Sequence, residues 1–493
     1  MLSATLRFDT LSDQLADGYS RPVRDEMLVE NVGRMAAAVP LGTGCDTASP
    51  PHLVPYGTEE QRGLAFSTNI SSLTGRFYDE DSYRISKIKK LDMEYTNKAR
   101  IFAPLNSQYK MMVSVENMTV EYRNSGVDSE WDAFAGETNG DIRQTSLWGE
   151  YEFFSKGWTV CRFVVKKENN IIAGCQISII TIRFLGRIGY IQMGPCMKEK
   201  SPDTIGFIID ELKNFARKNK LLYLIIAPNY PETDIVQHLE SNNFVVKKAV
   251  LPPTPKLEAT LLLNLTLTED ELLKQMKKGR KQNIRKGLEM PVEFKKGERE
   301  DLETCFNLLE ATAKRYNSYP EINTLDRLYK LWDLMRPHEW IDLHLGIVDG
   351  ETVCCTISYA FGNTFQCSYW GWNGKYANYN ISDVFDWCLI RYAKEKGYKY
   401  YDLVQLNLEC ANAISSNDDV PDAIKQKHFY GPTLYKMRFG GSVVTYPKIY
   451  AYYVNRLKYF FIHKVAGFMI EHLNTGFIVG FFYRLSRKRK HSV

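Results

Sequence analysis

The 493-residue sequence lacks the cysteine patterns that mark zinc sites and redox motifs. None of its ten cysteines stands in a CxxC pair or in a Cys/His cluster at zinc spacing, and most lie within apolar runs such as ETVCCTISYA. A free cysteine in such a run behaves as a small buried hydrophobic residue. We therefore expect a reduced, cytoplasmic protein without a structural metal.

Short motifs of several large enzyme classes are also absent. The chain contains no P-loop, no G-x-G-x-x-G, no G-x-S-x-G and no H-E-x-x-H, which argues against P-loop nucleotide hydrolysis, dinucleotide binding, α/β-hydrolase chemistry and zincin chemistry. It also lacks the Q/R-x-x-G-x-G/A turn with which acetyl-CoA-dependent acetyltransferases hold pyrophosphate. No metal and no cofactor are expected.

The sequence has no uninterrupted apolar run of about 18 residues, the length that a membrane-spanning helix needs. Its N-terminus carries no signal-peptide core, so secretion is not predicted. The C-terminal tail combines aromatic, apolar and basic residues, ends in RLSRKRKHSV and has Glu471 as its one acidic residue. A packed terminal helix and a peripheral contact with the inner face of a membrane both fit this composition.

What the sequence does contain is an ordinary globular composition, with 44% hydrophobic residues, 25% charged residues and a formal net charge of +5. This length and composition suit roughly two to four domains. Residues 1–111 are irregular, and we predict that they form an extension of unknown fold that the core does not require. Regular patterning begins near Met112 and continues from there.

The regular part predicts one α/β plan that occurs twice. In residues 112–254, strands over 157–167, 170–184 and 187–197 precede a helix over 202–220 and a strand over 221–228. In residues 255–446, helices over 268–289 and 299–317 precede hairpin strands over 340–372, a helix over 382–397 and a strand over 398–406. Two copies of one plan predict two duplicated mixed-sheet α/β domains that share a cleft.

The run KQMKKGRKQNIRKG carries seven cations and no acid. Like charges at i, i+4 destabilise a helix unless an anion relieves them. A solvated helix face and a phosphate-binding surface are both compatible with this run. If it binds phosphate, Arg280 and Arg285 are the best candidates, because arginine can hold a phosphate through two hydrogen bonds.

Two other segments carry chemically suggestive side chains. The stretch FQCSYWGWNGKYANYN places Tyr369 and Trp370 at a strand end, where α/β proteins often build sites. Core packing is the competing explanation for these aromatic side chains. Asp402 ends the next predicted strand, where it is either a solvated or capping carboxylate or a candidate general base. A hydroxyl or phosphate of the substrate is the alternative group to move the proton.

The stretch LYKMRFGGSVV sets Lys436 and Arg438 between Tyr435 and Phe439, just before a Gly–Gly pair. Cations and glycines are unusual in the interior of a buried strand. Either the cations extend to the surface along the neighbouring rings, or they face a negative group. The preceding polar segment 410–432 is expected to act as a flap beside them.

Five motifs in the same order resemble the FemABX-type aminoacyltransferases, a family built from two GNAT-like domains. The resemblance covers the chain from about Met112 to its end. The motifs are EWDAFAGETNGDIRQTSLWGEYEFFSKGW, GRIGYIQMGP, LLLNLTLTEDELLKQMKKGRKQNIRKG, GYKYYDLV and LYKMRFGG.

The resemblance implies transfer of an aminoacyl group from aminoacyl-tRNA to an amine of a nucleotide-linked or lipid-linked peptidoglycan precursor. It implies that Lys436 stabilises the oxyanion formed at the attacked ester, and that Arg280 and Arg285 hold substrate phosphates. Trp370 falls near the acceptor. It further implies two GNAT-like domains, at 112–254 and 255–446, with 447–493 returning to complete the first. Tyr369, Tyr435 and Arg438 are expected to bind substrate beside these residues.

Two other functions stay open at the level of sequence. One is a GNAT-like N-acyltransferase that uses a thioester donor on a cell-surface sugar or lipid. The other is an RNA-binding module without catalysis. The long coiled coil that some family members insert in the second domain is absent, so a tRNA contact would have to use the basic helix and the rim of the cleft.

Overall fold

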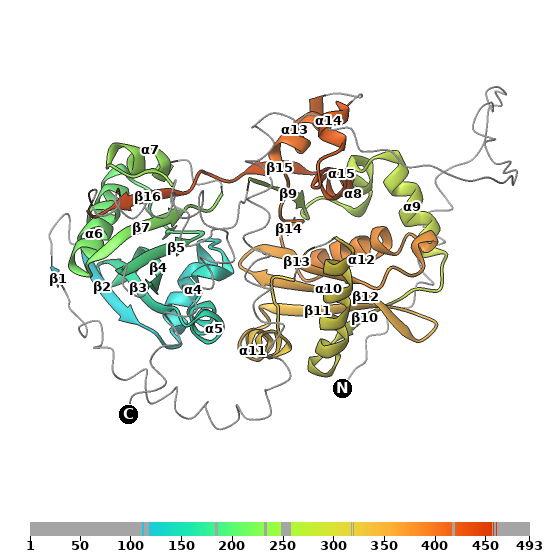
Figure 1. Cartoon of the computed structure of the whole chain (residues 1–493), viewed down its shortest axis with the longest axis horizontal. Coiled ribbons are helices and arrows are strands. Elements are labelled where there is room, and N and C mark those ends of the chain that lie inside the picture. Colours follow the sequence, from blue (N-terminus) through green and yellow to red (C-terminus); the bar gives the residue numbers. More distant parts are fainter. Residues whose placement is uncertain are drawn as a thin grey trace, which may run out of the picture. The chain divides into compact units, whose positions relative to one another are not determined.

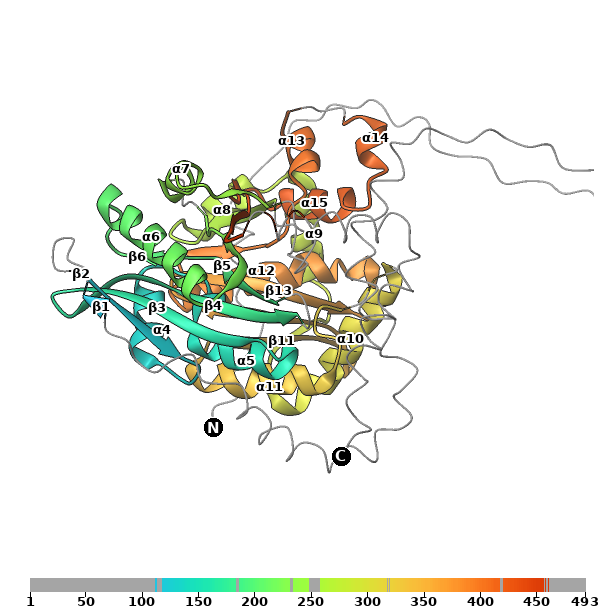
Figure 2. The same ribbon diagram turned by 60° about the vertical axis from the view of Figure 1, so that its left-hand side comes forward.

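The computed structural model describes residues 111–112, 118–182, 186–230, 234–247, 258–316, 318, 320–416, 420–455, 457 and 460. These residues form two mixed β-sheets with helices packed on them (Figures 1 and 2). All of them belong to the compact unit Tyr78–Val493. The expected extension over residues 1–111 and the tail beyond residue 460 lie outside the described residues, except for Met111.

The first sheet has the strand order β1-β2-β3-β4-β5-β7-β16-β8, with β6 paired to β4. All neighbouring pairs are antiparallel except β5 and β7, which are parallel. Its strands are β1 (Met111–Met112), β2 (Met118–Asn124), β3 (Thr159–Lys167), β4 (Asn170–Ile182), β5 (Gly186–Gln192), β6 (Cys196–Met197), β7 (Leu221–Ala227), β8 (Val245–Val246) and β16 (Tyr450–Tyr453).

Local sequence accounts for the helices of this half. In α6 the hydroxyl of Ser201 accepts from the backbone N–H of Thr204, Pro202 occupies the first turn, and an apolar stripe faces the core. Thr145 caps the start of α5, and Gly157 ends it in a left-handed conformation. The helices are α4 (Ser129–Glu137), η5 (Ile142–Gln144), α5 (Ser146–Lys156), α6 (Pro202–Lys218) and α7 (Asp234–Ser241).

The second sheet has the strand order β10-β11-β12-β13-β14-β9-β15. Its one parallel pair is β13 with β14, and the other neighbours are antiparallel. Its strands are β9 (Ala259–Asn264), β10 (Glu293–Gly297), β11 (Ile341–Val348), β12 (Glu351–Phe361), β13 (Thr364–Trp372), β14 (Tyr400–Asp402) and β15 (Ser442–Thr445).

The helices of this half lie before, between and after its strands in the sequence. They are α8 (Glu269–Gln275), α9 (Lys278–Leu288), η6 (Arg299–Asp301), α10 (Leu302–Arg315), α11 (Leu325–Met335), η7 (Arg336–His338), η8 (Ala377–Tyr379), α12 (Ile381–Glu395), α13 (Leu408–Ser416), α14 (Asp422–Lys425) and α15 (Tyr430–Met437). The predicted fold, a duplicated mixed α/β plan, is confirmed. The exact domain boundaries stay a prediction.

Several local expectations were wrong. The single helix expected over 268–289 is two helices, because the backbone is extended at Met276 and Lys277 and interrupts the helix there. The strand β9 was missed, although it pairs with both β14 and β15 near one edge of the second sheet. The strand expected over 398–406 ends at Asp402, since Val404 and Gln405 take positive φ angles. The stretch LYKM, for which no element was predicted, forms the end of helix α15.

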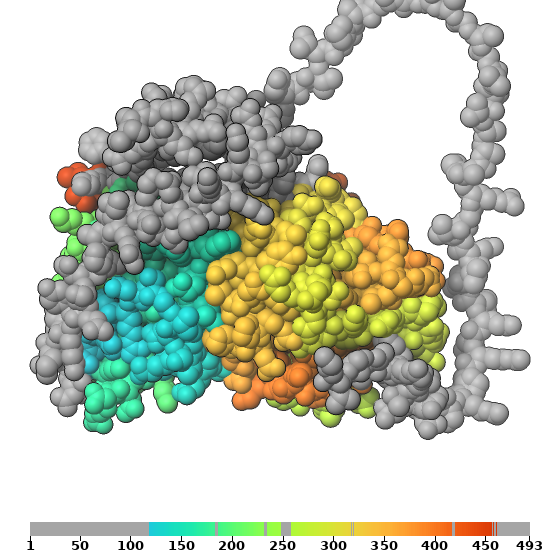
Figure 3. Space-filling model, turned by 90° about the horizontal axis from the view of Figure 1, so that it is seen from below, coloured from blue at the N-terminus to red at the C-terminus, as the bar shows by residue number. Residues whose placement is uncertain are grey.

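The two halves of the described unit pack against each other through α5 and α11. One hydrophobic cluster combines Trp131 and Trp148 from the first half with Leu331 and Tyr359 from the second. The rings of Trp148 and Tyr359 meet edge to face with centroids 5.7 Å apart. Figure 3 shows this face, where the cyan and teal residues of the first half meet the yellow residues of the second.

The Gly440–Gly441 pair has a steric explanation. Both residues have positive φ angles, of 79° and 84°. A Cβ on Gly441 would lie 2.5 Å from the carbonyl oxygen of Leu262, and one on Gly440 would lie 2.6 Å from that of Gln275. The pair therefore lets the chain pass from α15 into β15 while touching the backbone of β9 and α8.

Gly441→Ala should lower the free energy of unfolding by about 1–3 kcal/mol, because alanine is strained at this φ angle and its methyl group would clash with β9. Gly431→Ala is the matched control, since Gly431 lies in α15 and its added Cβ would meet no atom within 4 Å. We expect this control to be neutral or stabilising by up to about 1 kcal/mol. Denaturant unfolding of both variants measures the difference, and equal effects would contradict the steric explanation.

Candidate functional site

Lys436 lies in the last turn of α15 and points at the turn that follows β14. Its Nζ donates to the carbonyl oxygens of Val404, at 2.7 Å, and Gln405, at 3.1 Å. The side chain is partly exposed, yet desolvation lowers its pKa, an effect opposed by Cys367, Asp402 and Asp386. An ammonium group has three donors, so one remains to be directed at a ligand.

The turn that receives Lys436 is strained. Val404 and Gln405 have φ angles of 42° and 40°, which is unusual for two successive non-glycine residues and especially for a β-branched one. Such conformations persist only where the surroundings hold them in place. Here the two carbonyl groups gain an ammonium partner, and the N–H of Val404 donates to a carboxylate oxygen of Asp402 at 2.8 Å.

Asp402 is buried where the two halves meet. Its carboxylate accepts from the hydroxyl of Tyr230 at 3.0 Å, from the N–H of Val404 and, in a short contact, from the hydroxyl of Thr260. Burial raises its pKa, against the effect of these hydrogen bonds. The ring of Tyr446 stands edge-on to that of Tyr230 with centroids 5.0 Å apart. Asp402 thus joins the end of β14 to the segment after β7.

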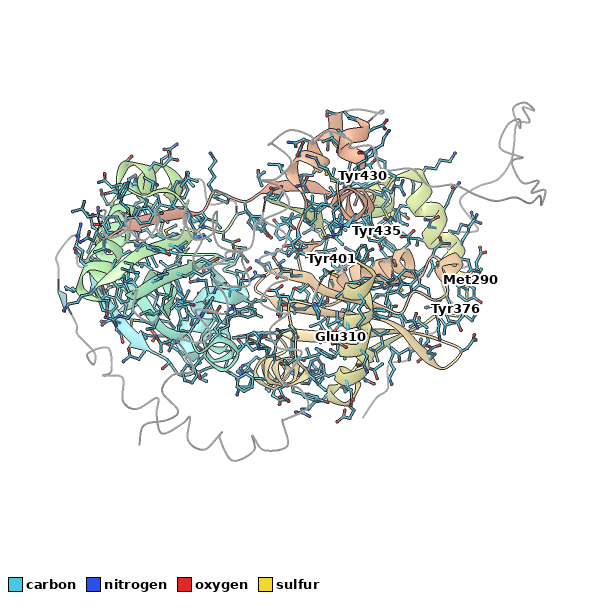
Figure 4. The ribbon with its side chains drawn as sticks, viewed as in Figure 1. Met290, Glu310, Tyr376, Tyr401, Tyr430 and Tyr435 are labelled. Atoms are coloured by element: carbon cyan, nitrogen blue, oxygen red, sulfur yellow. The ribbon has the colours of Figure 1, made fainter. Side chains whose placement is uncertain are left out.

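A second buried carboxylate, Asp386 of α12, holds the other side of α15. It accepts from the hydroxyl of Tyr435 at 2.6 Å. Burial raises its pKa to about 6, although Tyr435, Arg280 and Lys436 all favour the charged form. Figure 4 shows Tyr435 on α15 and Tyr401 at β14, with Tyr430 at the start of α15.

Asp386 should make stability depend on pH. Its pKa is higher in the folded protein, at about 6, than the ordinary value of 3.8, so the folded state binds this proton more tightly. Its contribution is therefore largest below pH 3.8 and is lost as the pH rises through 6. Asp386→Asn keeps an acceptor for Tyr435 and removes the titration. Between pH 4.5 and 7.5 the unmodified protein should lose about 2 kcal/mol relative to this variant. Denaturant titrations at both pH values measure this, and parallel pH profiles would contradict it.

Arg280 faces inward from α9. Its guanidinium forms a close ion pair with Asp383, donates to the carbonyl oxygen of Tyr435 at 2.6 Å, and lies 4.1 Å from the ring centroids of both Tyr435 and Phe439. The residue is only 3% exposed. This geometry makes Arg280 a support for the helix that carries Lys436.

Arg285 and Arg438 are exposed. Arg285 lies on the outer face of α9, and Arg438 follows α15 as its C-terminal cap. The N–H of Lys277 donates to the carbonyl oxygen of Arg438 at 3.0 Å, so the start of α9 touches the end of α15. Arg280 and Arg285 are the two arginines expected to hold phosphate. Arg280 is buried, so Arg285 is the one that a ligand can reach. The phosphate-binding role of Arg280 and Arg285 stays a prediction.

Tyr369 and Trp370 lie on β13, close to its end at Trp372. They are partly buried and point to opposite faces of the sheet, as neighbours on a strand do. The hydroxyl of Tyr359 donates to that of Tyr369 at 3.2 Å, whereas Trp370 packs edge-on against Phe385 of α12. Tyr369 therefore belongs to the junction of the two halves, and Trp370 packs beneath α12.

A cavity of about 140 Å³ lies beside this junction, and Tyr230, which bonds Asp402, is part of its wall. The lining residues also include Met193, Cys196, Lys200 and Asn229. A larger hollow of about 490 Å³, near Trp332 and Arg336, contains none of the predicted site residues. No group of three or more acidic, histidine or cysteine side chains is placed to hold a metal ion in the described part of the chain.

The structure places Lys436, Asp402 and Tyr435 near one another and surrounds them with partners that sequence reasoning missed. These are Tyr230, Thr260, Asp386 and Tyr446. No motif spacing relates Tyr230 to Asp402, because they are 172 residues apart. The segment expected to act as a flap contains α13 and α14. These two helices contact each other, and both also contact α15.

Comparison with family models gives two matches. Residues 126–320 match the FemAB family, and residues 272–409 match an acetyltransferase (GNAT) domain. The first match contains η5, α5 and α9, and the second contains Asp386 and Asp402 but ends before Lys436.

Among curated proteins, the chain is similar to Lipid II:glycine glycyltransferases of Staphylococcus aureus. The sequence from strain MRSA252 is 24% identical over 196 residues, which make up 38% of this chain and 46% of that protein. The sequence from strain USA300 is 23% identical over the same length. The chain thus spans about half the length of the curated relatives it matches.

Among solved structures, the chain resembles the crystal structure of FemX. The TM-score is 0.60 at 16% sequence identity, and the alignment covers 69% of this chain and all of that one. At this identity the likeness concerns the fold. No described helix is long and apolar enough to cross a membrane.

Proposed function

The chain belongs to the FemAB family, with GNAT-like domains, and from this premise we propose that it transfers an aminoacyl group from aminoacyl-tRNA to an amine of a peptidoglycan precursor. The names of its curated relatives, Lipid II:glycine glycyltransferases, support a lipid-linked precursor as the acceptor. The observation that carries the proposal is the placement of Lys436, a partly exposed cation with one donor to spare, on the turn that follows Asp402.

In the proposed reaction, the neutral acceptor amine attacks the ester carbonyl of the charged tRNA. A C–N bond forms, and the carbonyl oxygen becomes an oxyanion that the ammonium group of Lys436 stabilises. The C–O bond to the ribose then breaks, and the leaving ribose oxygen takes up the proton that the amine loses. Because Lys436 is partly desolvated, its charge acts more strongly on the oxyanion than it would in water.

Asp402 has a different part in this proposal. Three hydrogen bonds already occupy its carboxylate, which suits a residue that fixes Tyr230 and the Val404–Gln405 turn. Its raised pKa is compatible with proton transfer, so the role as a general base stays a prediction. In either role, Asp402 positions the turn whose two carbonyl groups, those of Val404 and Gln405, bind Lys436.

A second candidate is supported by the match of residues 272–409 to an acetyltransferase (GNAT) domain. In this case the donor would be a thioester and the acceptor a sugar or lipid of the cell surface. The same Lys436 would stabilise the oxyanion at the thioester carbonyl.

One assay separates the candidates. The full chain is incubated with a pool of radiolabelled aminoacyl-tRNAs and with purified nucleotide-linked and lipid-linked peptidoglycan precursors. Label on a precursor is the expected result. Deacylated tRNA and labelled acetyl-CoA are the controls. Acylation from the thioester alone would favour the second candidate, and RNA binding without any transfer would overturn both in favour of a binding module.

A further inference from the structure

Helix α12 carries two buried carboxylates, and they differ in how their charge is compensated. Asp383 and Asp386 are 6% and 5% exposed and lie three residues apart, so they share one face of the helix. The guanidinium of Arg280 forms a close ion pair with Asp383. Asp386 instead accepts from a neutral donor, the hydroxyl of Tyr435, at 2.6 Å. A buried charge is costly without an opposite charge nearby, so Asp386 needs a further partner.

Lys436 is the cation that remains for Asp386. The titratable and charged side chains around this carboxylate are Tyr435 and Lys436 of α15, Arg280 of α9, Tyr401 of β14, Cys354 of β12 and Cys367 of β13. Burial raises the pKa of both thiols and of both tyrosines, so these four groups stay neutral at ordinary pH. Arg280 already compensates Asp383.

Lys436 has the complementary need. Its Nζ donates to two backbone carbonyl oxygens, which carry no full charge. The groups that favour its charged form are Cys367, Asp402 and Asp386. Burial raises the pKa of Cys367 to about 12, so its thiol is not a counter-charge in the neutral range. The two carboxylates are therefore the groups that hold the lysine in its charged form.

Asp402 and Asp386 act on Lys436 from different elements. Asp402, at the end of β14, already receives three hydrogen bonds and joins this strand to Tyr230 of the first half. Asp386 reaches α15 through its hydrogen bond with Tyr435, the residue before the lysine. Among the described residues, no direct ion pair joins Asp386 to Lys436. The third donor of the ammonium group is thus left for a ligand.

We infer that Asp386 is a positioning residue that acts through Lys436: its carboxylate keeps the lysine protonated and, through Tyr435, fixes the helix that carries it. The inference rests on the proposed function for the reaction that the lysine serves. Desolvation favours the neutral form of an amine, and a neutral amine has no charge to place beside an oxyanion. A buried carboxylate nearby opposes this loss of the proton.

Competitive acetylation of the full chain with trace acetic anhydride tests the inference without any transfer reaction. The reagent acylates the neutral amine, so labelling of Lys436, followed by mass spectrometry, rises as the lysine loses its proton. Asp386→Asn keeps an acceptor for Tyr435 and removes the charge. It should lower the pKa of Lys436 by about one unit. Asp386→Glu should restore most of the shift, and Asp386→Ser serves if the asparagine variant does not fold.

Two control variants separate the charge of Asp386 from its hydrogen bond. Tyr435→Phe removes the hydrogen bond and keeps the carboxylate, so it should shift the pKa of Lys436 by much less than Asp386→Asn does. Asp203→Asn removes an exposed carboxylate of α6, in the first half, and should leave this pKa unchanged. An unchanged pKa of Lys436 in Asp386→Asn, or an equal shift in Asp203→Asn, would overturn the inference.

The pH profile of kcat extends the test to the proposed reaction. The alkaline decline of kcat should begin about one pH unit lower in Asp386→Asn, so the ratio of its kcat to that of the unmodified protein should fall about tenfold across the decline. A purely structural role would lower kcat by the same factor at every pH and would overturn the inference.

Failure of the inference and failure of the proposed function give different results. A shifted pKa of Lys436 without transfer from any aminoacyl-tRNA would keep the coupling between Asp386 and the lysine and remove the proposed function. Transfer from aminoacyl-tRNA with an unshifted pKa in Asp386→Asn would do the reverse.

Discussion

In the proposed reaction, Lys436→Met should lower the rate of aminoacyl transfer by about ten- to a thousand-fold, because removal of one donor to a developing oxyanion costs up to about a thousandfold. Methionine keeps most of the length of the side chain but has no charge to place at the carbonyl. The effect should fall on kcat more than on KM, because the oxyanion exists only in the transition state. Steady-state kinetics with saturating donor measures it.

Lys436 also bonds the carbonyl groups of Val404 and Gln405, so a purely structural role is the main competing explanation. Two readouts distinguish them. On the catalytic explanation the thermal midpoint of Lys436→Met stays within a few degrees, while activity collapses. Because burial lowers the pKa of Lys436, activity of the unmodified protein should also decline at a pH below 10.5 as the lysine loses its proton. Lys436→Arg should retain charge over this range and shift that decline upward.

Lys399→Met provides a matched control, since Lys399 is exposed and far from α15 in sequence. Its activity should stay within about twofold. Near-normal activity of Lys436→Met would remove this lysine from the mechanism, whereas a loss of activity that follows the loss of stability would make it a support for the turn.

Arg280→Met should lower the free energy of unfolding by about 3–5 kcal/mol. The variant would leave the carboxylate of Asp383, only 6% exposed, without its cation, and the carbonyl oxygen of Tyr435 without its donor. It would also remove a guanidinium that fills the space between the rings of Tyr435 and Phe439. Denaturant unfolding, followed by the fluorescence of the second half's tryptophans, measures the loss.

A double-mutant cycle assigns this loss to the ion pair. Asp383→Asn in the Arg280→Met background should cost much less than it does alone, because it removes the uncompensated charge. Arg285→Met on the outer face of the same helix should change stability by less than about 0.5 kcal/mol. If Arg280→Met were as stable as Arg285→Met but bound tRNA poorly, Arg280 would be a phosphate ligand after all.

Sequence alone predicted the duplicated α/β plan, because alternating and helical hydrophobic periods survive in each element regardless of its neighbours. The capping box of Thr268 and Glu271 is a local example, since both partners lie within one turn of α8. The same reasoning missed β9, whose run of leucines has no clear period, and it joined α8 to α9 across an extended break that no proline or glycine marks.

Some candidate site residues can be recognised from the sequence, whereas others are distinguished only by their packing. Lys436 and Asp402 are candidates because their residue types stand out against apolar surroundings. The structure places Asp402 against Tyr230 of the first half and Lys436 on the turn that follows Asp402. Arg280 and Arg285 are indistinguishable in the sequence run. They lie five residues apart on a helix, about 140° around its axis, so packing buries one and exposes the other.

Features that depend on near neighbours along the chain can thus be read from the sequence: the order of elements, their caps, the family resemblance and the presence of an unbalanced basic run. Which polar groups meet depends on the three-dimensional packing. Tyr230 reaches Asp402, Arg280 reaches Asp383 and Asp386 reaches Tyr435 across gaps of 49 to 172 residues. Contacts of this kind depend on how two sheets and their helices pack together. A one-dimensional pattern does not specify that geometry, because burial and hydrogen bonding select partners by distance in space.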